Sequence, residues 1–136
     1  MEKFRINRRV YYYETDRMGR VYHSNFVNWM EEARTEYIRS RGTTYKIMEE
    51  NGIFLPISEI GVKYFHPVEY DENLAILLEI TEITRVKVSF NYEFWNETLT
   101  VKYAESFSTN IFSDTNGKIK RVDNDVINVL KSIKQN

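Results

Sequence analysis

The stretch from Asp16 to His23 contains the residue types and the spacing that could do chemistry. Asp16 is a carboxylate in a turn-forming stretch with Gly19, and His23 stands where a strong helical pattern begins. The start of a helix leaves main-chain N–H groups without helical partners and carries the positive end of the helix dipole, so it can stabilise negative charge on a substrate oxygen. With Asp16 nearby as base or nucleophile, this combination predicts a catalytic site.

Each of these residues also has a structural explanation that the sequence leaves open. An aspartate in a turn commonly accepts hydrogen bonds from the backbone of the same turn. A histidine at a helix start can bond the backbone, and an aromatic residue beside it, such as Tyr22, often only packs. The chemistry of the stretch is therefore a hypothesis that depends on further signals.

A helix is predicted over residues 24–41, directly after this turn. Apolar residues recur there at spacings of three and four, Gly42 supplies a stop, and Ser24 or Asn25 is expected to cap the first turn. The face predicted to be buried contains Phe26, Val27, Met30, Ala33, Tyr37 and Ile38. The remaining face carries charged residues that we interpret as solvated rather than as metal ligands: Glu31, Glu32, Arg34, Glu36 and Arg39.

The rest of the chain predicts a sheet. Apolar and polar residues alternate over 4–12, with Arg8 as an exception on the apolar side, and again over the four segments 60–64, 74–80, 86–94 and 99–111. Short helices are expected over 45–50 and 123–133, and a turn over 114–117 precedes a short extended piece around Ile119. Because the connections between strands are short, antiparallel neighbours are favoured. We predict an α+β fold in which an antiparallel sheet of about five strands wraps one long helix.

Composition narrows the class of protein. The 136 residues have the length of one domain, which we expect to span 1–136. Lys and Arg (19) nearly balance Asp and Glu (20), so the overall charge does not suggest nucleic acid. The absence of cysteine excludes a thiolate metal site, and two histidines argue against zinc. With no signal region and no apolar run of membrane-spanning length, we expect a cytoplasmic protein without a membrane span.

Two motifs resemble the hotdog-fold acyl-CoA thioesterases of the 4-hydroxybenzoyl-CoA thioesterase and YbgC-like group. The first covers 13–26 (YETDRMGRVYHSNF) and continues on the helix into Glu32, Ala33, Arg34 and Glu36; the second covers 66–72 (HPVEYDE), before a strand. With matching strand spacing, the resemblance covers nearly the whole chain. It implies a hotdog fold, hydrolysis of an acyl-CoA to a free acid and coenzyme A, no metal or redox cofactor, and a homodimer or homotetramer.

The resemblance also implies roles for individual residues. Asp16 takes the position of the catalytic carboxylate, and His23 takes the position whose main-chain N–H points at the thioester oxygen; its side chain is a second candidate catalytic group. Gly19 fits the tight turn between them. Tyr22, Asn25 and Tyr64 are expected near the thioester, although packing explains each of them as well. Coenzyme A phosphates require cations, for which the candidates are Lys63, Arg85 and Lys87, each also explained as solvated charge.

Three other functions remain open at this stage. A close variant is a thioesterase that acts on acyl carrier protein, and a different class is a noncatalytic hotdog module that binds acyl thioesters or a protein. A hotdog hydratase or dehydratase would need an Asp or Asn and His pair placed to act on the carbon chain. The spacing of Asp16 and His23 follows the thioesterase pattern instead.

Overall fold

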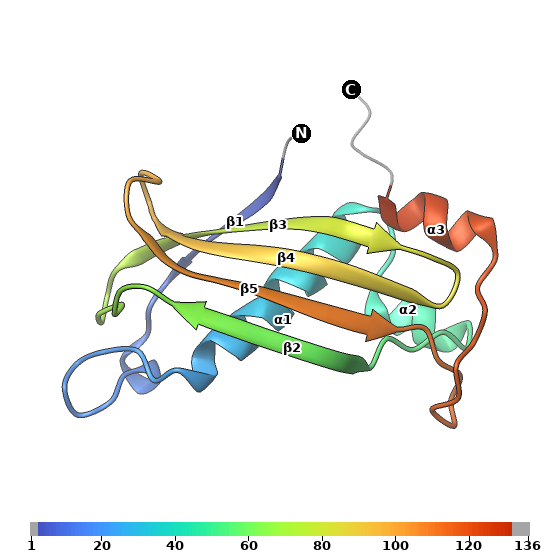
Figure 1. Ribbon diagram of the computed structural model, residues 1–136, viewed down its shortest axis with the longest axis horizontal. Helices are drawn as coiled ribbons and strands as arrows, with labels where there is room; N and C mark the ends of the chain where they lie inside the picture. The colour runs from blue at the N-terminus through green and yellow to red at the C-terminus, as the bar shows by residue number, and fades with distance from the viewer. Residues whose placement is uncertain (1–2, 132–136) are drawn as a thin grey trace.

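The computed structural model describes residues 3–131 and places one antiparallel sheet against one long helix (Figure 1). The sheet has five strands in the order β1-β3-β4-β5-β2, and every neighbouring pair is antiparallel. This arrangement confirms the predicted α+β fold. The elements are β1 (Phe4–Arg9), a 3-10 turn η1 (Tyr12–Glu14), α1 (Ser24–Ser40), α2 (Tyr45–Glu50), β2 (Ile57–Tyr64), β3 (Asn73–Ile83), β4 (Lys87–Asn96), β5 (Lys102–Ile111) and α3 (Asn124–Lys131).

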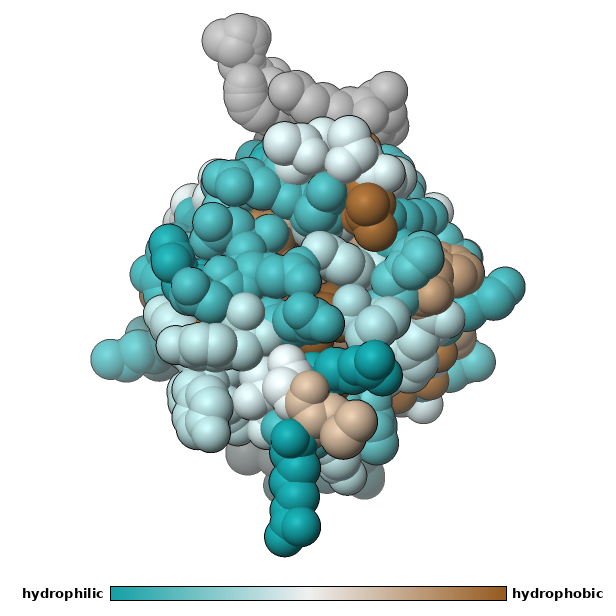
Figure 2. All heavy atoms as spheres, turned by 90° about the vertical axis from the view of Figure 1, so that its left-hand side faces the viewer, coloured by the Kyte–Doolittle hydropathy of each residue, from teal (hydrophilic) through white to brown (hydrophobic). Residues whose placement is uncertain are grey.

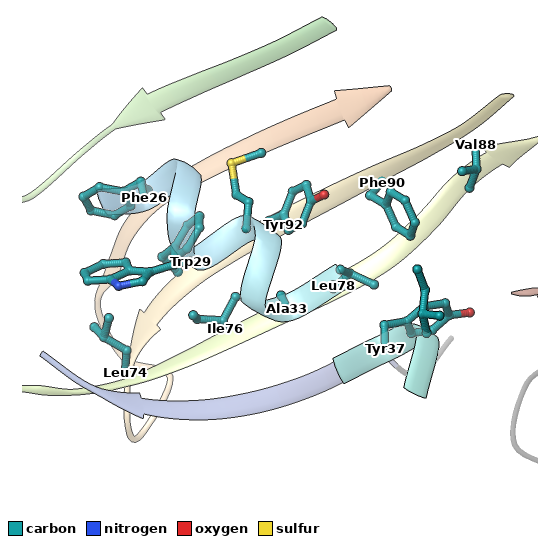
Figure 3. Close-up of a cluster of buried hydrophobic side chains, with 14 of the residues drawn as sticks. Phe26, Trp29, Ala33, Tyr37, Leu74, Ile76, Leu78, Val88, Phe90 and Tyr92 are labelled. Carbon is teal, nitrogen blue, oxygen red and sulfur yellow. The ribbon is translucent and has the colours of Figure 1, made fainter. Parts of the chain in front are cut away.

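The apolar stripe of α1 forms the centre of the core. Phe26, Trp29, Ala33 and Tyr37 recur at spacings of three and four, so they share one face of the helix, and all are buried. Figure 3 shows these side chains among apolar residues of β3 and β4. The set that they contact on the sheet includes Leu74, Ile76, Leu78, Val88, Phe90 and Tyr92, which alternate along the strands as a one-face pattern requires.

The boundaries of α1 agree with the sequence prediction, but its N-cap residue and part of its buried face do not. Gly42 has φ of +90° and ends α1 as expected. The N-cap position is His23, whose side chain makes no cap hydrogen bond, so the expected cap by Ser24 or Asn25 is wrong. Val27 is exposed, and Arg34, predicted to be solvated, is buried. Val27 and Arg34 are seven residues apart and lie on the same side of the helix, so this side is covered in the middle of α1 and open at its first turn.

Several strand ends also differ from the prediction. The first strand stops at Arg9, because the chain turns into η1, where Tyr12 is 76% exposed. The last strand begins at Lys102, because Leu99 adopts φ of +61° in the preceding turn. Ile119 forms the expected short extended piece as an isolated bridge with Ser113. The closing helix is present, and the end of the range predicted for it lies outside the described residues.

The sheet has two open edges, β1 and β2. At the β2 edge, Ile57, Ile60 and Tyr64 are 37 to 47% exposed, although each stands opposite a buried residue of β5 on the side that faces α1. Within residues 3–131, no helix is both long enough and apolar enough to cross a membrane.

Candidate active site

The loop between η1 and α1 lies at the end of the molecule where α1 starts (Figure 1). Within this loop, Asp16 begins a tight turn. Its Oδ1 accepts hydrogen bonds from the main-chain N–H groups of Met18 (2.8 Å) and Arg20 (3.2 Å). The N–H of Gly19 donates to the carbonyl of Asp16, and Gly19 has φ of +79°, which glycine adopts without strain. Within the described part of the chain, Oδ2 of Asp16 accepts no hydrogen bond. One carboxylate oxygen thus holds the turn, and the other is free.

A second turn elsewhere in the protein has the same construction. Asp114 Oδ1 accepts hydrogen bonds from the N–H groups of Asn116 (2.8 Å) and Lys118 (3.0 Å), and Gly117 has φ of +84°. The local geometry of Asp16 is therefore that of an ordinary aspartate turn. What distinguishes Asp16 from Asp114 is its position beside the start of α1.

The start of α1 presents main-chain donors that no other group uses. The N–H of Asn25 donates to Tyr22 O (3.0 Å) and that of Phe26 donates to His23 O (3.1 Å). The N–H groups of His23 and Ser24 donate to no acceptor within residues 3–131. Two unpaired N–H groups at the positive end of a 17-residue helix can bind an oxygen that develops negative charge.

Backbone contacts tie the Asp16 turn to this helix start. Thr15 and Val21 form an antiparallel bridge at the base of the turn. One step further, the N–H of Tyr22 donates to the carbonyl of Glu14 (2.9 Å), and Asn25 Nδ2 donates to the same carbonyl (2.9 Å). The carboxylate and the free N–H groups are thus held on one rigid unit. Asn25 has a structural role here, and its contact with substrate stays a prediction.

Glu14 is the residue that the sequence reasoning missed. Its side chain is buried and accepts hydrogen bonds from Arg8 Nη1 (2.7 Å), Tyr11 N (2.9 Å) and Trp29 Nε1 (3.0 Å). Burial alone would raise the pKa of Glu14, but Arg8, Tyr11 and Trp29 together lower it below its usual value. A signal existed, because Arg8 occupies an apolar position of the first strand and a buried arginine requires an acidic partner.

The second motif packs directly against the first. The N–H of Val21 donates to Val68 O (2.7 Å), that of Tyr70 donates to Gly19 O (3.2 Å), and Arg20 forms an isolated bridge with Glu69. The two motifs lie about fifty residues apart in the sequence, yet Val68, Glu69 and Tyr70 contact the Asp16 turn through the backbone.

The two predicted aromatic residues lie at the helix start. Tyr64 packs edge-on against Phe26, with ring centroids 5.1 Å apart, and its hydroxyl donates to His23 O (3.3 Å). Burial raises the pKa of Tyr64, so the phenol stays protonated at neutral pH. Tyr22 stacks on the imidazole of His23 at 4.5 Å, and both rings are exposed. The structure therefore brings Tyr22, His23, Asn25 and Tyr64 together.

The three predicted cations are not gathered at one place. Lys63 neighbours Tyr64 but lies on the opposite face of β2, with Nζ 6.0 Å from the ring of Phe65. Arg85 donates to Val122 O (2.8 Å), and Lys87 pairs with Glu82 (3.4 Å). Lys87 begins β4, which runs for about 30 Å toward the end of the sheet that carries Asp16. Of these three predicted cations, Lys63 is the one that lies near the site.

The site is open in a single chain. Figure 2 shows this end of the molecule as largely hydrophilic, with apolar atoms visible in gaps between polar ones. Three clefts of about 370, 480 and 570 Å³ lie elsewhere, and neither Asp16 nor His23 lines any of them. Within the described residues, no group of three His, Cys, Asp or Glu side chains could hold a metal ion.

Comparisons with known proteins identify the family and the fold. A family model described as thioesterase-like superfamily matches residues 10–130. The acyl-CoA thioesterase YbgC of Haemophilus influenzae is 30% identical over 97 residues, which cover 71% of this chain and 71% of that protein. A hypothetical protein from Aquifex aeolicus has a solved structure with 34% identity and a TM-score of 0.87, covering 94% of this chain and 99% of that one.

The structure of a DHNA-CoA thioesterase from Staphylococcus aureus has 28% identity and a TM-score of 0.87, covering 95% of this chain and 89% of that one. The likeness to these solved structures extends over almost the whole chain, and it confirms the predicted hotdog fold.

Proposed function

This chain belongs to the thioesterase-like superfamily, and from that premise we propose that it hydrolyses an acyl-CoA thioester to a free acid and coenzyme A. The observation that carries the proposal is the joining of a carboxylate with one free oxygen to a helix start with two unpaired N–H groups. Relatives named as acyl-CoA thioesterases support the substrate class. Acyl carrier protein thioesters share the same reacting group and are a second substrate to test.

In the proposed reaction, the thioester oxygen accepts hydrogen bonds from the N–H groups of His23 and Ser24. Asp16 then either deprotonates a water molecule that attacks the carbonyl carbon or attacks that carbon itself and forms an anhydride that water opens. In both routes the C–S bond breaks, water supplies the oxygen of the new acid, and a proton goes to the leaving thiolate. The tetrahedral oxyanion is stabilised by donors that are already oriented, so little reorganisation is needed.

The remaining roles follow from position. Gly19 allows the turn to close below Asp16, and Tyr64 holds the carbonyl of His23, which keeps the first turn of α1 in place. The imidazole of His23, with Tyr22, Asn25 and Tyr64, surrounds the thioester. Of the three candidate cations for a coenzyme A phosphate, Lys63 lies nearest to the site, while Arg85 and Lys87 would require a second chain to reach it. Neither a metal nor a redox cofactor takes part.

The test is release of free thiol from a panel of short, long and aromatic acyl-CoAs. Asp16→Asn keeps the shape of the turn but removes the charge, and Asp114→Asn is the matched control because it changes the same turn at a remote place. We expect Asp16→Asn to lose at least about a hundredfold in kcat, in the range of a lost acid–base group. Asp114→Asn should keep the native rate with a similar change in stability.

Two outcomes would overturn the proposal. If Asp16→Asn hydrolyses as fast as Asp114→Asn, then Asp16 is only a turn residue and the site is misassigned. If the native protein hydrolyses no acyl-CoA and no acyl carrier protein thioester but still binds them, it is a binding module.

A further inference from the structure

The middle of α1 buries an arginine that has no acidic partner. Arg34 is 4% exposed, its Nε donates to Tyr45 Oη (3.3 Å) and its Nη1 donates to Tyr92 Oη (3.0 Å). Burial raises the pKa of both phenols, so neither supplies a negative charge at neutral pH. Among residues 3–131, Arg34 forms no ion pair, and its Nη2 donates to no acceptor.

The acidic residues of the same helix form no ion pair with Arg34 among residues 3–131. Glu31 lies near enough to Tyr45 to help raise the pKa of that phenol but, within the described chain, forms no ion pair with Arg34. Glu32 Oε1 forms an ion pair with Arg8 Nε of β1 (2.6 Å), and Glu36 Oε1 lies 4.0 Å from Arg39 Nε at the surface. A guanidinium held away from water is costly unless an anion offsets its lost hydration. Its fork of N–H groups matches the two oxygens of a carboxylate. The N–H groups of Arg34 Nη2, which donate to no acceptor among residues 3–131, are therefore suited to bind a carboxylate.

A second buried donor on the facing strand also lacks a partner. Ser106 is 8% exposed, and its Oγ is buried without any hydrogen bond. Ser106 stands opposite Tyr92 in the register of β4 and β5, on the side of the sheet that faces α1. The next residue on that side, Ser108, shares a hydrogen bond of 2.6 Å with Tyr92 Oη. The backbone of Tyr92 thus lies beside Ser106, and the hydroxyl of Tyr92 contacts Arg34.

These donors continue inward from the proposed thioester site. On β5, Ser106 is two residues from Ala104, which pairs with Tyr64 beside the helix start. Two residues of a strand span about 7 Å. On α1, Arg34 lies about 15 Å beyond Ser24, and a long helical side chain leans back toward the helix start. An acyl chain that enters at the helix start and follows β5 would meet Ser106 and then Arg34.

We propose that the acyl group carries a second, distal carboxylate, which Arg34 binds through Nη2 and Ser106 binds through its hydroxyl. The substrates would then be monothioesters of medium-length dicarboxylic acids. This inference rests on the proposed thioesterase function but can fail independently of it. Val62, which stands opposite Ser106 on β2, and Tyr64 form the apolar wall beside the intervening carbons.

The experiment compares octanoyl-CoA with the matched thioester of octanedioic acid, which differs only in the distal carboxylate. The variants are Arg34→Met, which keeps much of the side-chain volume, and Ser106→Ala, which removes a hydroxyl that stabilises nothing in the free protein. Ser89→Ala is the control, because Ser89 Oγ contacts Thr109 on the opposite face of the sheet. Thermal unfolding of each variant verifies that it is folded.

We expect the native protein to prefer the carboxylated substrate in kcat/KM by at least roughly tenfold, the factor that one charge-assisted hydrogen bond supplies. Arg34→Met should abolish this preference, Ser106→Ala should reduce it several-fold, and Ser89→Ala should keep it. If the native protein hydrolyses octanoyl-CoA as fast or faster, or if Arg34→Met retains the preference, the inference is wrong while the thioesterase function stands.

A binding measurement decides the matter without turnover. Octanedioate at millimolar concentration should raise the melting temperature of the native protein by a few degrees, octanoate should raise it less, and Arg34→Met should respond equally to both. A shift that is the same for the two acids in the native protein contradicts the inference even if no thioester is hydrolysed.

Discussion

Replacing Glu14 with glutamine should destabilise the protein by about 3 kcal/mol, because the Glu14 carboxylate joins three elements around the candidate site. Four N–H groups approach it: both Nη atoms of Arg8 (2.7 Å each), Tyr11 N (2.9 Å) and Trp29 Nε1 (3.0 Å). Glutamine keeps only one accepting oxygen and turns an NH₂ group toward the other donors. At least two of the four contacts are therefore lost.

The magnitude follows from the chemistry of these contacts. A hydrogen bond to a charged group contributes about 1.5–3 kcal/mol, so two lost bonds give about 3–6 kcal/mol. Arg8 keeps a second partner, Glu32, at 2.6 Å, and is not left as an uncompensated charge, which places the cost near the lower end. With an unfolding entropy of about 2.1 cal/mol/K per residue, 136 residues lose about 10 °C in Tm.

Urea unfolding followed by circular dichroism measures this cost, and Glu36→Gln is the matched control. Glu36 lies on the same helix as Trp29, but its side chain is 52% exposed and only approaches Arg39 at 4.0 Å. We expect the control to change stability by no more than about 0.5 kcal/mol. If Glu14→Gln is as mild as Glu36→Gln, the carboxylate does not hold the elements together and the reasoning is refuted.

The pH dependence of stability, compared between the native protein and Glu14→Gln, gives an independent check of the role of the Glu14 carboxylate. Because the pKa of Glu14 is lowered in the folded protein, its contribution is complete above the ordinary glutamate pKa of about 4.3 and is lost as the pH falls through the folded value. The stability difference between native protein and Glu14→Gln should be constant near neutrality and shrink in acid. A difference that grows as the pH falls below 4.3 would contradict the lowered pKa.

Three further predictions concern the turn, the cofactor and the assembly. Gly19→Ala and Gly117→Ala should each cost about 1 kcal/mol, because both glycines have positive φ with open space around them, but only Gly19→Ala should slow thiol release; equal rates for both variants would separate the Asp16 turn from catalysis. Dialysis against EDTA should leave the rate unchanged, and a loss that added metal restores would show a metal requirement. Light scattering should give at least two chains per particle, because the β2 edge exposes apolar side chains; Ile60→Lys should then yield single chains, and a native monomer would contradict the expected homodimer or homotetramer.

The fold was predictable because the residue pattern within each short segment indicates whether that segment is a helix or a strand. The stripe around Phe26 and Ala33 has helical spacing, and β4 alternates polar and apolar residues from Lys87 to Phe94. The strand β3 is apolar from Leu74 to Leu78 and has the length and composition of a buried strand. The errors fall at the ends, where tertiary contacts override pattern: Tyr12 has the spacing of a strand residue, yet the chain turns there so that Glu14 can enter the core. Ends depend on contacts with distant segments, which periodicity does not encode.

In the candidate site, too, the features that depend on neighbouring residues were predictable, and those that depend on distant segments were not. Asp16, Gly19 and the helix start lie within eight residues, so residue types and local turn chemistry were enough to place them together. The support of that turn by Val68 and Glu69 was not visible, because it depends on a backbone contact between segments far apart in the chain.

The sequence by itself determined the class of fold, the position of the long helix and the turn that carries Asp16, since these follow from periodicity and glycine conformation within short windows. Only the tertiary structure decided which charged residues are buried. Glu14 and Arg34 look like surface residues in the sequence, yet both lie in the interior, where Glu14 pairs with Arg8 and Arg34 donates hydrogen bonds to Tyr45 and Tyr92. Whether a charged side chain can be buried depends on the groups that surround it in space, and only the folded chain brings those groups together.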